Sequence, residues 1–367
     1  MPILTPPIGC TLDDLDTPCL IVDLDSLERN IRRLSEYFRS HRVAWRPHAK
    51  SYKSSAIAQK VVAAGAIGVT CAKLGEAEVM ADGGVRDLLI ANPLVGRHKL
   101  ARLVELRRRA DPIAVLDHPD HVRALSEAAS SAGVTLRTMV EVDIGMKRCG
   151  VPPGDAAVEL ARRISDSPGL EFAGIMGWEG QLVTVADPLE KSKQIAASVG
   201  LLSQTSAAIE RIGIGCPIVS AGGSGSFQVT ARLGIATEIQ AGGAIFMDLF
   251  YRNKCQVAAQ EFALTVLATV TSRPAPDRAV IDAGRKTMNL ELYMPEVRGR
   301  SDLKLRSLSA EHGVLEVLSG PGPAIGDRIE LIPGYGDFTT VLHDRMYGFR
   351  AGRLEVIWPL DARGRLD

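Results

Sequence analysis

One lysine stands where a nucleophilic amine would be useful. The octapeptide RPHAKSYK, residues 46–53, places Lys50 directly after a segment with the composition of a strand. A primary amine at such a place can attack an aldehyde and form an imine with it. The neighbouring cations Arg46, His48 and Lys53 would favour the neutral amine that this reaction needs. The octapeptide alone is more typical of a surface lysine, so the interpretation depends on the rest of the chain.

A second basic group follows another strand-like segment. In the stretch VEVDIGMKRCG, residues 140–150, Lys147 and Arg148 come shortly after an apolar run. The planar guanidinium of an arginine stays charged and can donate hydrogen bonds to an oxyanion in a pocket. A surface Lys-Arg pair in a loop is the alternative, and spacing alone does not separate the two.

Two glycine-containing loops follow late strand-like segments. The first, SAGGSGSF, combines glycines, which let the backbone approach an anion, with serine hydroxyls that can donate to it. The second lies in EIQAGGAIFMD. A flexible turn is the alternative for each loop, but two such loops on consecutive late strands favour a phosphate site. Ser220 and Ser224 are the candidate donors of the first loop, and Gly242 and Gly243 form the glycine pair of the second.

These three features suit one cofactor. A lysine that forms an imine, an arginine for an oxyanion and a cradle for a phosphate each match a different part of pyridoxal 5'-phosphate. This cofactor would carry out carbanion chemistry, and the protein would bind and orient it.

The elements that must position these residues alternate between strands and helices. From Cys19 to about residue 253, apolar runs alternate with amphipathic, alanine-rich segments. Eight or nine strand signals, apolar on both faces, predict a (β/α)8 barrel over residues 19–253. A doubly wound sheet is the alternative, but no Gly-x-Gly-x-x-Gly follows the first strand. In a barrel, catalytic groups come from the carboxyl ends of the strands.

The last third of the chain has a different pattern. After about residue 254, β-rich runs are separated by Gly, Pro and Asp turns, and RAGRLEVIW is typical of a final hairpin. This pattern predicts a second, all-β domain over residues 254–367, which residues 1–18 would join.

Composition excludes several classes of protein. The 367 residues carry 43 basic and 43 acidic side chains, so the net charge is zero and a dedicated nucleic-acid binder is not expected. The six cysteines form no C-x-x-C pair, and they are typical of free cytosolic thiols. The sequence shows neither a signal peptide nor an apolar run long enough to span a membrane. We therefore expect a cytoplasmic protein.

The chain resembles the D-threonine aldolase and D-serine dehydratase family, which has an alanine-racemase-like barrel. The motifs DTPCLIVDLDSLERNI, RPHAKSYK, EVDIGMKRCGV, AGGSGS, EIQAGGAIFMD, VIDAGRKT and IPGYGDFTTVLHD stand in the family's order and spacing. The resemblance implies that Lys50 carries pyridoxal 5'-phosphate, with His48 beside it, and that Arg148 reaches the phenolic oxygen. It places six loop residues around the phosphate or the ring: Ser220, Gly222, Gly223, Ser224, Gly242 and Gly243. It also implies a small amino-acid substrate and a homodimer with shared active sites.

The chain departs from the family pattern at the expected metal site. Tyr335, in IPGYGDFTT, stands where the family carries a histidine, while Asp337 keeps the second ligand position. A neutral tyrosine is a poor ligand for a divalent cation, and one carboxylate would hold Mn²⁺ or Mg²⁺ only weakly. His343 is a substitute ligand, or it is a structural residue of the LHD turn.

A second departure lies in GIMGWEGQLVT, where relatives have a Tyr-His-Gly sequence. Trp178 would stack on the cofactor, or it would simply line the barrel. Glu179 would act as a base or bind a substrate amine.

The resemblance and its departures leave several activities open. The first is a lyase that cleaves β-hydroxy-D-amino acids to glycine and an aldehyde, with Lys50, Tyr335 and Asp337 in the site. The second is a dehydratase for D-serine or 3-hydroxy-D-aspartate, which needs a Lewis acid and is therefore weakened more by the missing histidine. The third is a metal-free racemase or epimerase with Tyr335 as its second base. A non-catalytic cofactor carrier is disfavoured, because the added β domain would cover the pocket.

Overall fold

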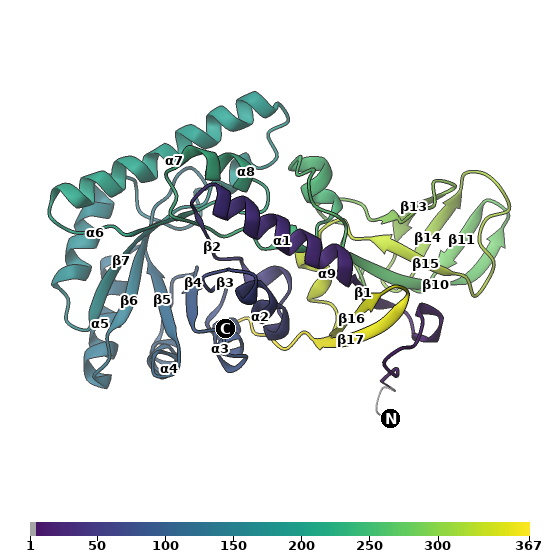
Figure 1. Ribbon diagram of the computed structural model, residues 1–367, viewed down its shortest axis with the longest axis horizontal. Helices are drawn as coiled ribbons and strands as arrows, with labels where there is room; N and C mark the ends of the chain where they lie inside the picture. Colours follow the sequence, from purple (N-terminus) through teal and green to yellow (C-terminus); the bar gives the residue numbers. More distant parts are fainter. Residues whose placement is uncertain (1–4) are drawn as a thin grey trace. The chain divides into compact units, whose positions relative to one another are not determined.

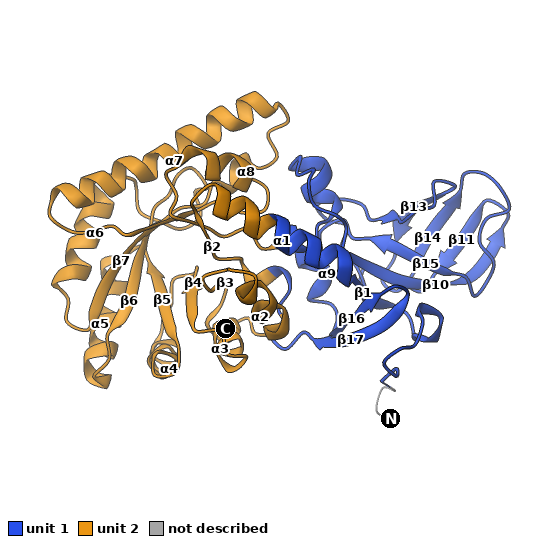
Figure 2. Ribbon diagram, viewed as in Figure 1, with its two compact units in different colours: residues 1–33, 51–53, 243–363 blue, residues 34–50, 54–242, 364–367 orange. Residues whose placement is uncertain are grey.

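The computed structural model of the protein describes residues 5–367, which divide into two compact units (Figures 1 and 2). Of the described residues, unit 1 contains 5–33, 51–53 and 243–363, and unit 2 contains 34–50, 54–242 and 364–367. Within residues 5–367, no helix combines the length and the apolar character that a membrane span requires.

Unit 2 holds eight parallel strands in the order β2-β9-β8-β7-β6-β5-β4-β3. The two ends of this order meet, because His48 forms a parallel bridge with Thr70 and the N–H of Ile67 donates to the carbonyl of Trp45 at 2.9 Å. The barrel prediction is therefore confirmed. The strands are β2 (Ala44–Trp45), β3 (Val69–Cys71), β4 (Asp87–Ile90), β5 (Asp111–Leu116), β6 (Leu136–Glu141), β7 (Leu170–Met176), β8 (Ile218–Ala221) and β9 (Glu238–Ile239).

Helices alternate with these strands, as the 3.6-residue periodicity predicts. In α5, the His118 side chain accepts from the N–H of Asp120, Pro119 occupies the first turn, and Gly133 ends the helix with φ +64°. In α7, Asp187 caps the helix by accepting from the N–H of Glu190 at 2.8 Å. The helices are α1 (Leu24–Ser40), α2 (Ser55–Ala63), α3 (Leu74–Asp82), α4 (Arg97–Arg107), α5 (Pro119–Ala132), α6 (Asp155–Asp166), α7 (Pro188–Arg211) and α8 (Phe227–Thr230).

A buried ion network joins the starts of several barrel strands. The guanidinium of Arg46, 1% exposed, donates from Nε to Glu238 at 2.9 Å and from Nη1 to Asp87 at 2.7 Å. Glu238 begins β9 and Asp87 begins β4, so one side chain ties two strands of the barrel. Arg46 was expected to act on the Lys50 amine; instead, its charge is matched by these carboxylates.

Unit 1 contains a nine-stranded, mostly antiparallel sheet. Its first member, β1, corresponds to the run that was predicted as the first barrel strand. That placement is wrong, because β1 pairs antiparallel with β10 and parallel with β16. The strands are β1 (Cys19–Asp23), β10 (Leu264–Ala275), β11 (Arg278–Ile281), β12 (Glu296–Val297), β13 (Leu303–Leu308), β14 (Gly313–Val317), β15 (Arg328–Ile332), β16 (Arg345–Arg350) and β17 (Arg353–Pro359).

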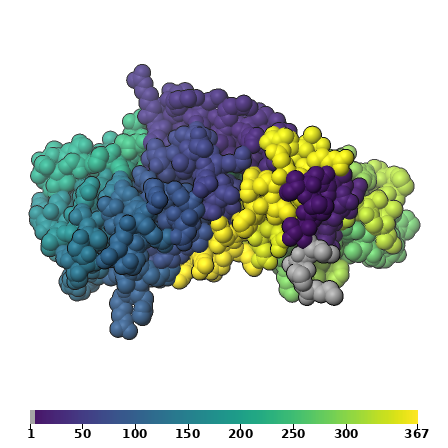
Figure 3. All heavy atoms as spheres, turned by 60° about the horizontal axis from the view of Figure 1, so that its bottom comes forward, coloured from purple at the N-terminus to yellow at the C-terminus, as the bar shows by residue number. Residues whose placement is uncertain are grey.

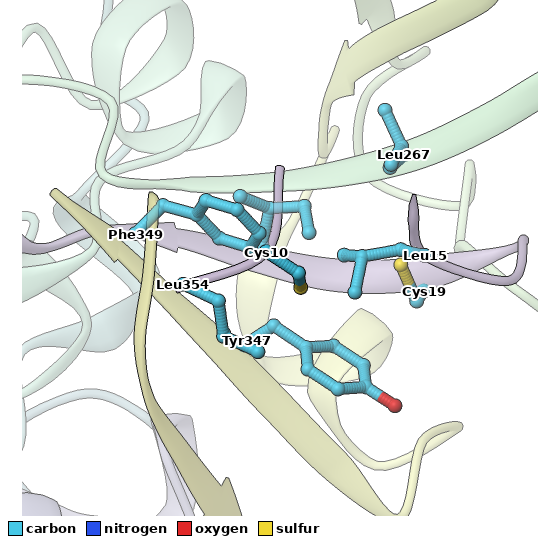
Figure 4. Packing of buried hydrophobic residues seen from close by; sticks show 8 residues of the cluster. Cys10, Leu15, Cys19, Leu267, Tyr347, Phe349 and Leu354 are labelled. Carbon is cyan, nitrogen blue, oxygen red and sulfur yellow. The ribbon is translucent and has the colours of Figure 1, made fainter. Parts of the chain in front are cut away.

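The final hairpin and the N-terminal segment share one core in unit 1. Strands β16 and β17 pair antiparallel across Ala351 and Gly352, whose φ values of +48° and +73° suit a tight two-residue turn. The backbones of Cys10 and Leu354 are hydrogen-bonded at 2.9 Å. The surface view shows the N-terminal segment beside the C-terminal strands (Figure 3). The cluster beneath (Figure 4) comprises Cys10, Leu15, Cys19, Ile21, Leu267, Tyr347, Phe349 and Leu354.

Candidate active site

Lys50 lies in a short 3-10 turn, Ala49–Ser51, that follows strand β2. It is partly buried, and its backbone N–H donates to Nδ1 of the His48 ring at 3.4 Å. The backbone of His48 packs tightly against Gly242, where a Cβ atom would lie only 2.2 Å from the His48 carbonyl oxygen. Gly242 is therefore required for the close approach of the segments that follow β2 and β9.

The glycine-rich loop follows strand β8 and is buried. Ser220 is the penultimate residue of the strand, and its hydroxyl accepts from Nε2 of Gln240 at 2.9 Å. Ser224 is 5% exposed. Gly222 has φ +73°, a conformation that favours glycine. A Cβ at Gly223 would lie 2.4 Å from the Trp178 ring, so Trp178 packs on the loop backbone.

Glu179 is fully buried beneath this loop. Its Oε1 accepts from the Thr230 hydroxyl at 2.6 Å, and its Oε2 accepts from the N–H of Gly222 at 3.3 Å. Both carboxylate oxygens are thus engaged by protein donors. This geometry does not support the predicted role of Glu179 as a base or as a ligand for a substrate amine.

Arg148 is carried by a loop that two carboxylates hold in place. The loop closes through a parallel bridge between Val142 and Val151. Asp143 Oδ1 accepts from the N–H groups of Gly145 and Lys147, at 2.9 and 3.0 Å. The Arg148 side chain is exposed, so it is available to a ligand.

The second carboxylate that holds this loop belongs to Asp117, in the segment after β5. Asp117 Oδ2 accepts from the N–H of Gly150 at 2.8 Å. Sequence analysis did not identify Asp117, because it lies 31 residues from Arg148 and has no local motif.

Glu141, at the end of β6, is a functional candidate that sequence analysis missed. Its side chain is 5% exposed, and burial raises its pKa to about 7. The Arg148 charge opposes this rise, whereas Asp117 and Asp143 add to it. An acidic residue at the end of an apolar strand was the signal that could have identified it.

The Glu141 carboxyl should make stability depend on pH. Because its folded-state pKa is raised above the ordinary value of 4.5, the folded protein favours the neutral form. Its stabilising contribution is therefore complete below pH 4.5 and is lost as pH rises through about 7. We expect Glu141→Gln to be more stable than the wild type at pH 8, by about 3 kcal/mol at most, and to lose this advantage at pH 4.5. Urea unfolding at both pH values measures this difference.

The exposed Glu159 of α6 provides a matched control for this measurement. Its side chain is 48% exposed, so Glu159→Gln should change stability little and equally at both pH values. An equal effect of the Glu141 and Glu159 substitutions would contradict the burial argument.

Unit 1 contains a compact cluster of two tyrosines and two aspartates. The Tyr335 hydroxyl donates to Asp337 Oδ2 at 2.9 Å, and its ring centroid lies 5.8 Å from that of Tyr251. Burial, followed by the charge of Asp337, raises the pKa of Tyr335 well above its ordinary value. Asp248 accepts from the N–H groups of Gly336 and Tyr251, each at 2.8 Å.

The Asp248 carboxyl, 2% exposed, has its pKa raised to about 8, chiefly by burial. Asp248 and Tyr251 were not predicted. Gly243, predicted at the phosphate, packs against Tyr251: a Cβ there would lie 2.6 Å from the Tyr251 ring.

The two metal-ligand candidates each have a protein partner. His343 Nε2 lies 2.8 Å from the carbonyl of Thr287, and burial lowers the pKa of the imidazole. One oxygen of Asp337 accepts from Tyr335. Throughout residues 5–367, no three His, Cys, Asp or Glu side chains come together as ligands for a metal ion. These donors therefore do not fit a tightly held cation.

The residues of unit 2 fit pyridoxal 5'-phosphate. The carboxyl ends of parallel barrel strands face one mouth. Lys50, Arg148, Trp178 and the glycine-rich loop follow β2, β6, β7 and β8 at that end. At Gly223 the Trp178 ring leaves no room for a Cβ, so this position of the loop consists of backbone alone.

Comparisons with known proteins find relatives that match nearly the whole chain. Two family models match the chain: the alanine racemase N-terminal domain over residues 22–249 and the serine dehydratase domain over residues 263–349. The chain is 37% identical to the D-threonine aldolase of Arthrobacter sp, over 98% of this chain and 97% of that protein. It is 35% identical to the 3-hydroxy-D-aspartate aldolase of Paracoccus denitrificans, over 97% and 94%. The solved D-threonine aldolase of Filomicrobium marinum is 40% identical, with a TM-score of 0.96 and coverage of 99% and 100%.

Proposed function

Because the chain belongs to the family of D-threonine aldolases and D-serine dehydratase-like enzymes with an alanine-racemase-type barrel, we propose that it cleaves β-hydroxy-D-amino acids to glycine and an aldehyde. Enzymes of this family depend on pyridoxal 5'-phosphate. The observation that carries the proposal is the placement of Lys50, Arg148 and the buried glycine-rich loop at the carboxyl ends of strands of one barrel.

Each group of unit 2 has a separate task in this proposal. Lys50 would supply the amine that holds the cofactor covalently, and Arg148 would donate to its phenolic oxygen. The loop from Ser220 to Ser224 would hold the phosphate. Trp178 packs against the same loop. When bound, pyridoxal 5'-phosphate supplies the electron sink that stabilises negative charge at the substrate α-carbon.

The Tyr335–Asp337 pair would move the proton of the substrate's β-hydroxyl group. Cleavage of the bond between the α- and β-carbons requires the loss of this proton as the aldehyde forms. Since burial makes an ionised Tyr335 unfavourable, its oxygen would receive the substrate proton while it passes its own to Asp337 Oδ2, 2.9 Å away. Substrate cleavage would then proceed without a tightly held metal ion.

Tyr335→Phe should lower the turnover number for cleavage by about 10²- to 10⁴-fold, because it removes the proton-carrying oxygen. Exchange of the Cα proton of D-alanine in D₂O should continue, since that step does not involve a β-hydroxyl group. A racemase with Tyr335 as its second base predicts the reverse: loss of exchange. Aldehyde release and NMR-detected exchange, measured on the same two proteins, separate these outcomes.

Substrate class is tested with stereoisomers. A coupled assay for the aldehyde should detect cleavage of D-threonine, D-allo-threonine or 3-hydroxy-D-aspartate, and none of L-threonine. A 2-oxo acid and ammonia from these substrates would instead establish the dehydratase.

Repeating the assay with a chelator tests whether cleavage requires a metal ion. We expect at least about half of the activity to remain, because the donors do not fit a tightly held ion. The homodimer with shared active sites remains a prediction. Light scattering would measure the oligomeric state.

A further inference from the structure

The segment after β7 supports the glycine-rich loop through two consecutive side chains. Trp178 packs on the backbone of Gly223, and Glu179 accepts from the backbone of Gly222. The two side chains therefore contact neighbouring residues of one loop, one through an aromatic ring and the other through a carboxylate. All of these residues lie in unit 2.

The Glu179 carboxylate joins both ends of the segment that contains this loop. Gly222 begins the segment after β8, and Thr230 ends helix α8. Glu179 accepts from Gly222 through Oε2 and from the Thr230 hydroxyl through Oε1. Glu179 and Thr230 are each 0% exposed, so water does not substitute for either partner.

The loop also has an internal set of hydrogen bonds. The N–H of Gly223 donates to the Ser226 hydroxyl at 3.1 Å, and the N–H of Phe227 donates to the Gly223 carbonyl at 2.9 Å. These bonds shape the turn but do not attach it to the rest of the barrel. Glu179, in the segment after β7, attaches the loop at Gly222, the residue whose φ is +73°.

We propose that Glu179 is a positioning residue that holds the glycine-rich loop in the shape that binds the cofactor phosphate. This inference rests on the proposed function, because it assigns the loop to that phosphate. Glu179 acts through Gly222 and Thr230 and does not contact the reacting atoms. Its loss should therefore weaken binding of the phosphate selectively and leave the attachment chemistry of Lys50 intact.

The type of substitution matters, because the Gly222 N–H and the Thr230 hydroxyl both donate to the Glu179 side chain. Glu179→Leu keeps a similar volume but leaves the Gly222 N–H and the Thr230 hydroxyl without their partner, which is costly inside a protein. Glu179→Gln can accept from Gly222 through its amide oxygen. Its amide group can donate to the Thr230 hydroxyl, which is able to accept. Glutamine should therefore rescue the loop.

The experiment compares pyridoxal 5'-phosphate with pyridoxal, which lacks the phosphate. Dissociation constants for both aldehydes are measured by absorbance for the wild type, Glu179→Leu, Glu179→Gln and Thr230→Val. Thr205→Val is the matched control: Thr205 is also fully buried and donates to a backbone carbonyl, that of Leu201, at 2.7 Å, but it lies in α7. Circular dichroism confirms that each variant is folded.

We expect Glu179→Leu to weaken binding of pyridoxal 5'-phosphate about tenfold or more, with the affinity for pyridoxal nearly unchanged. Thr230→Val should show a smaller effect in the same direction, while Glu179→Gln and Thr205→Val should retain the wild-type ratio of the two constants. If Glu179→Leu is unfolded, the same comparison is made with Thr230→Val.

The outcomes separate the inference from the proposed function. A wild type that prefers pyridoxal 5'-phosphate, together with folded Glu179→Leu and Thr230→Val proteins that keep this preference, would overturn the positioning role alone. Equal weakening of both aldehydes would also overturn it. A wild type that binds neither aldehyde would overturn the proposed function itself.

Discussion

Replacing Lys50 by alanine is expected to abolish cleavage of β-hydroxy-D-amino acids and to prevent covalent attachment of pyridoxal 5'-phosphate. Lys50, in the turn after β2, is the proposed attachment point of the cofactor, and the cofactor's electron sink is required for the cleavage. The measurement is borohydride reduction of the loaded protein, followed by mass spectrometry. The wild type should carry one reduced cofactor on the peptide that contains Lys50.

The exposed Lys193 of α7 is the control for this result. Lys193→Ala should keep both the labelled peptide and the activity, because this side chain lies on an outer helix. Labelling of a different lysine in the wild type would remove Lys50 from its assigned role. Full activity of Lys50→Ala would do the same.

Arg46→Leu is expected to have the largest effect on stability, a loss of about 3–5 kcal/mol in the free energy of unfolding. The substitution leaves Glu238, 2% exposed, as a buried carboxylate without its guanidinium partner. It also removes the bond to Asp87 that ties β4 to β9 through Arg46. Urea unfolding of the cofactor-free protein measures this loss.

Arg123→Leu is a suitable comparison, because Arg123 is 65% exposed and pairs with exposed carboxylates of α5. Its cost should stay within about 0.5 kcal/mol. The double variant Arg46→Leu with Glu238→Leu should recover part of the stability, since it removes the unpaired buried charge. A loss below about 1 kcal/mol for Arg46→Leu would show that this ion network contributes little.

The barrel was predictable because its strands are short, apolar on both faces and separated by amphipathic helices. The run at Cys19–Asp23 has the same character, yet it belongs to the sheet of unit 1. The sequence pattern of a strand that is buried on both faces is the same in either sheet. The partners of β1, the strands β10 and β16, are more than 200 residues away in the sequence. Local pattern does not contain that information.

The candidate site shows the same division between local and distant information. Lys50 and the glycine-rich loop are marked by local sequence, and the structure places both after barrel strands. The environment of Glu179 depends on Thr230, 51 residues away, so its engagement in the interior could not be anticipated. The same holds for Asp248, which accepts from Gly336, 88 residues away.

The most direct test of the proposed activity is proton NMR of the protein loaded with pyridoxal 5'-phosphate, in D₂O with D-threonine. The lyase account predicts glycine and acetaldehyde in equal amounts. It predicts the same products from the same reaction with chelator. Deuterium at the α-carbon of intact substrate, with no glycine and no aldehyde, would contradict the account and favour a racemase.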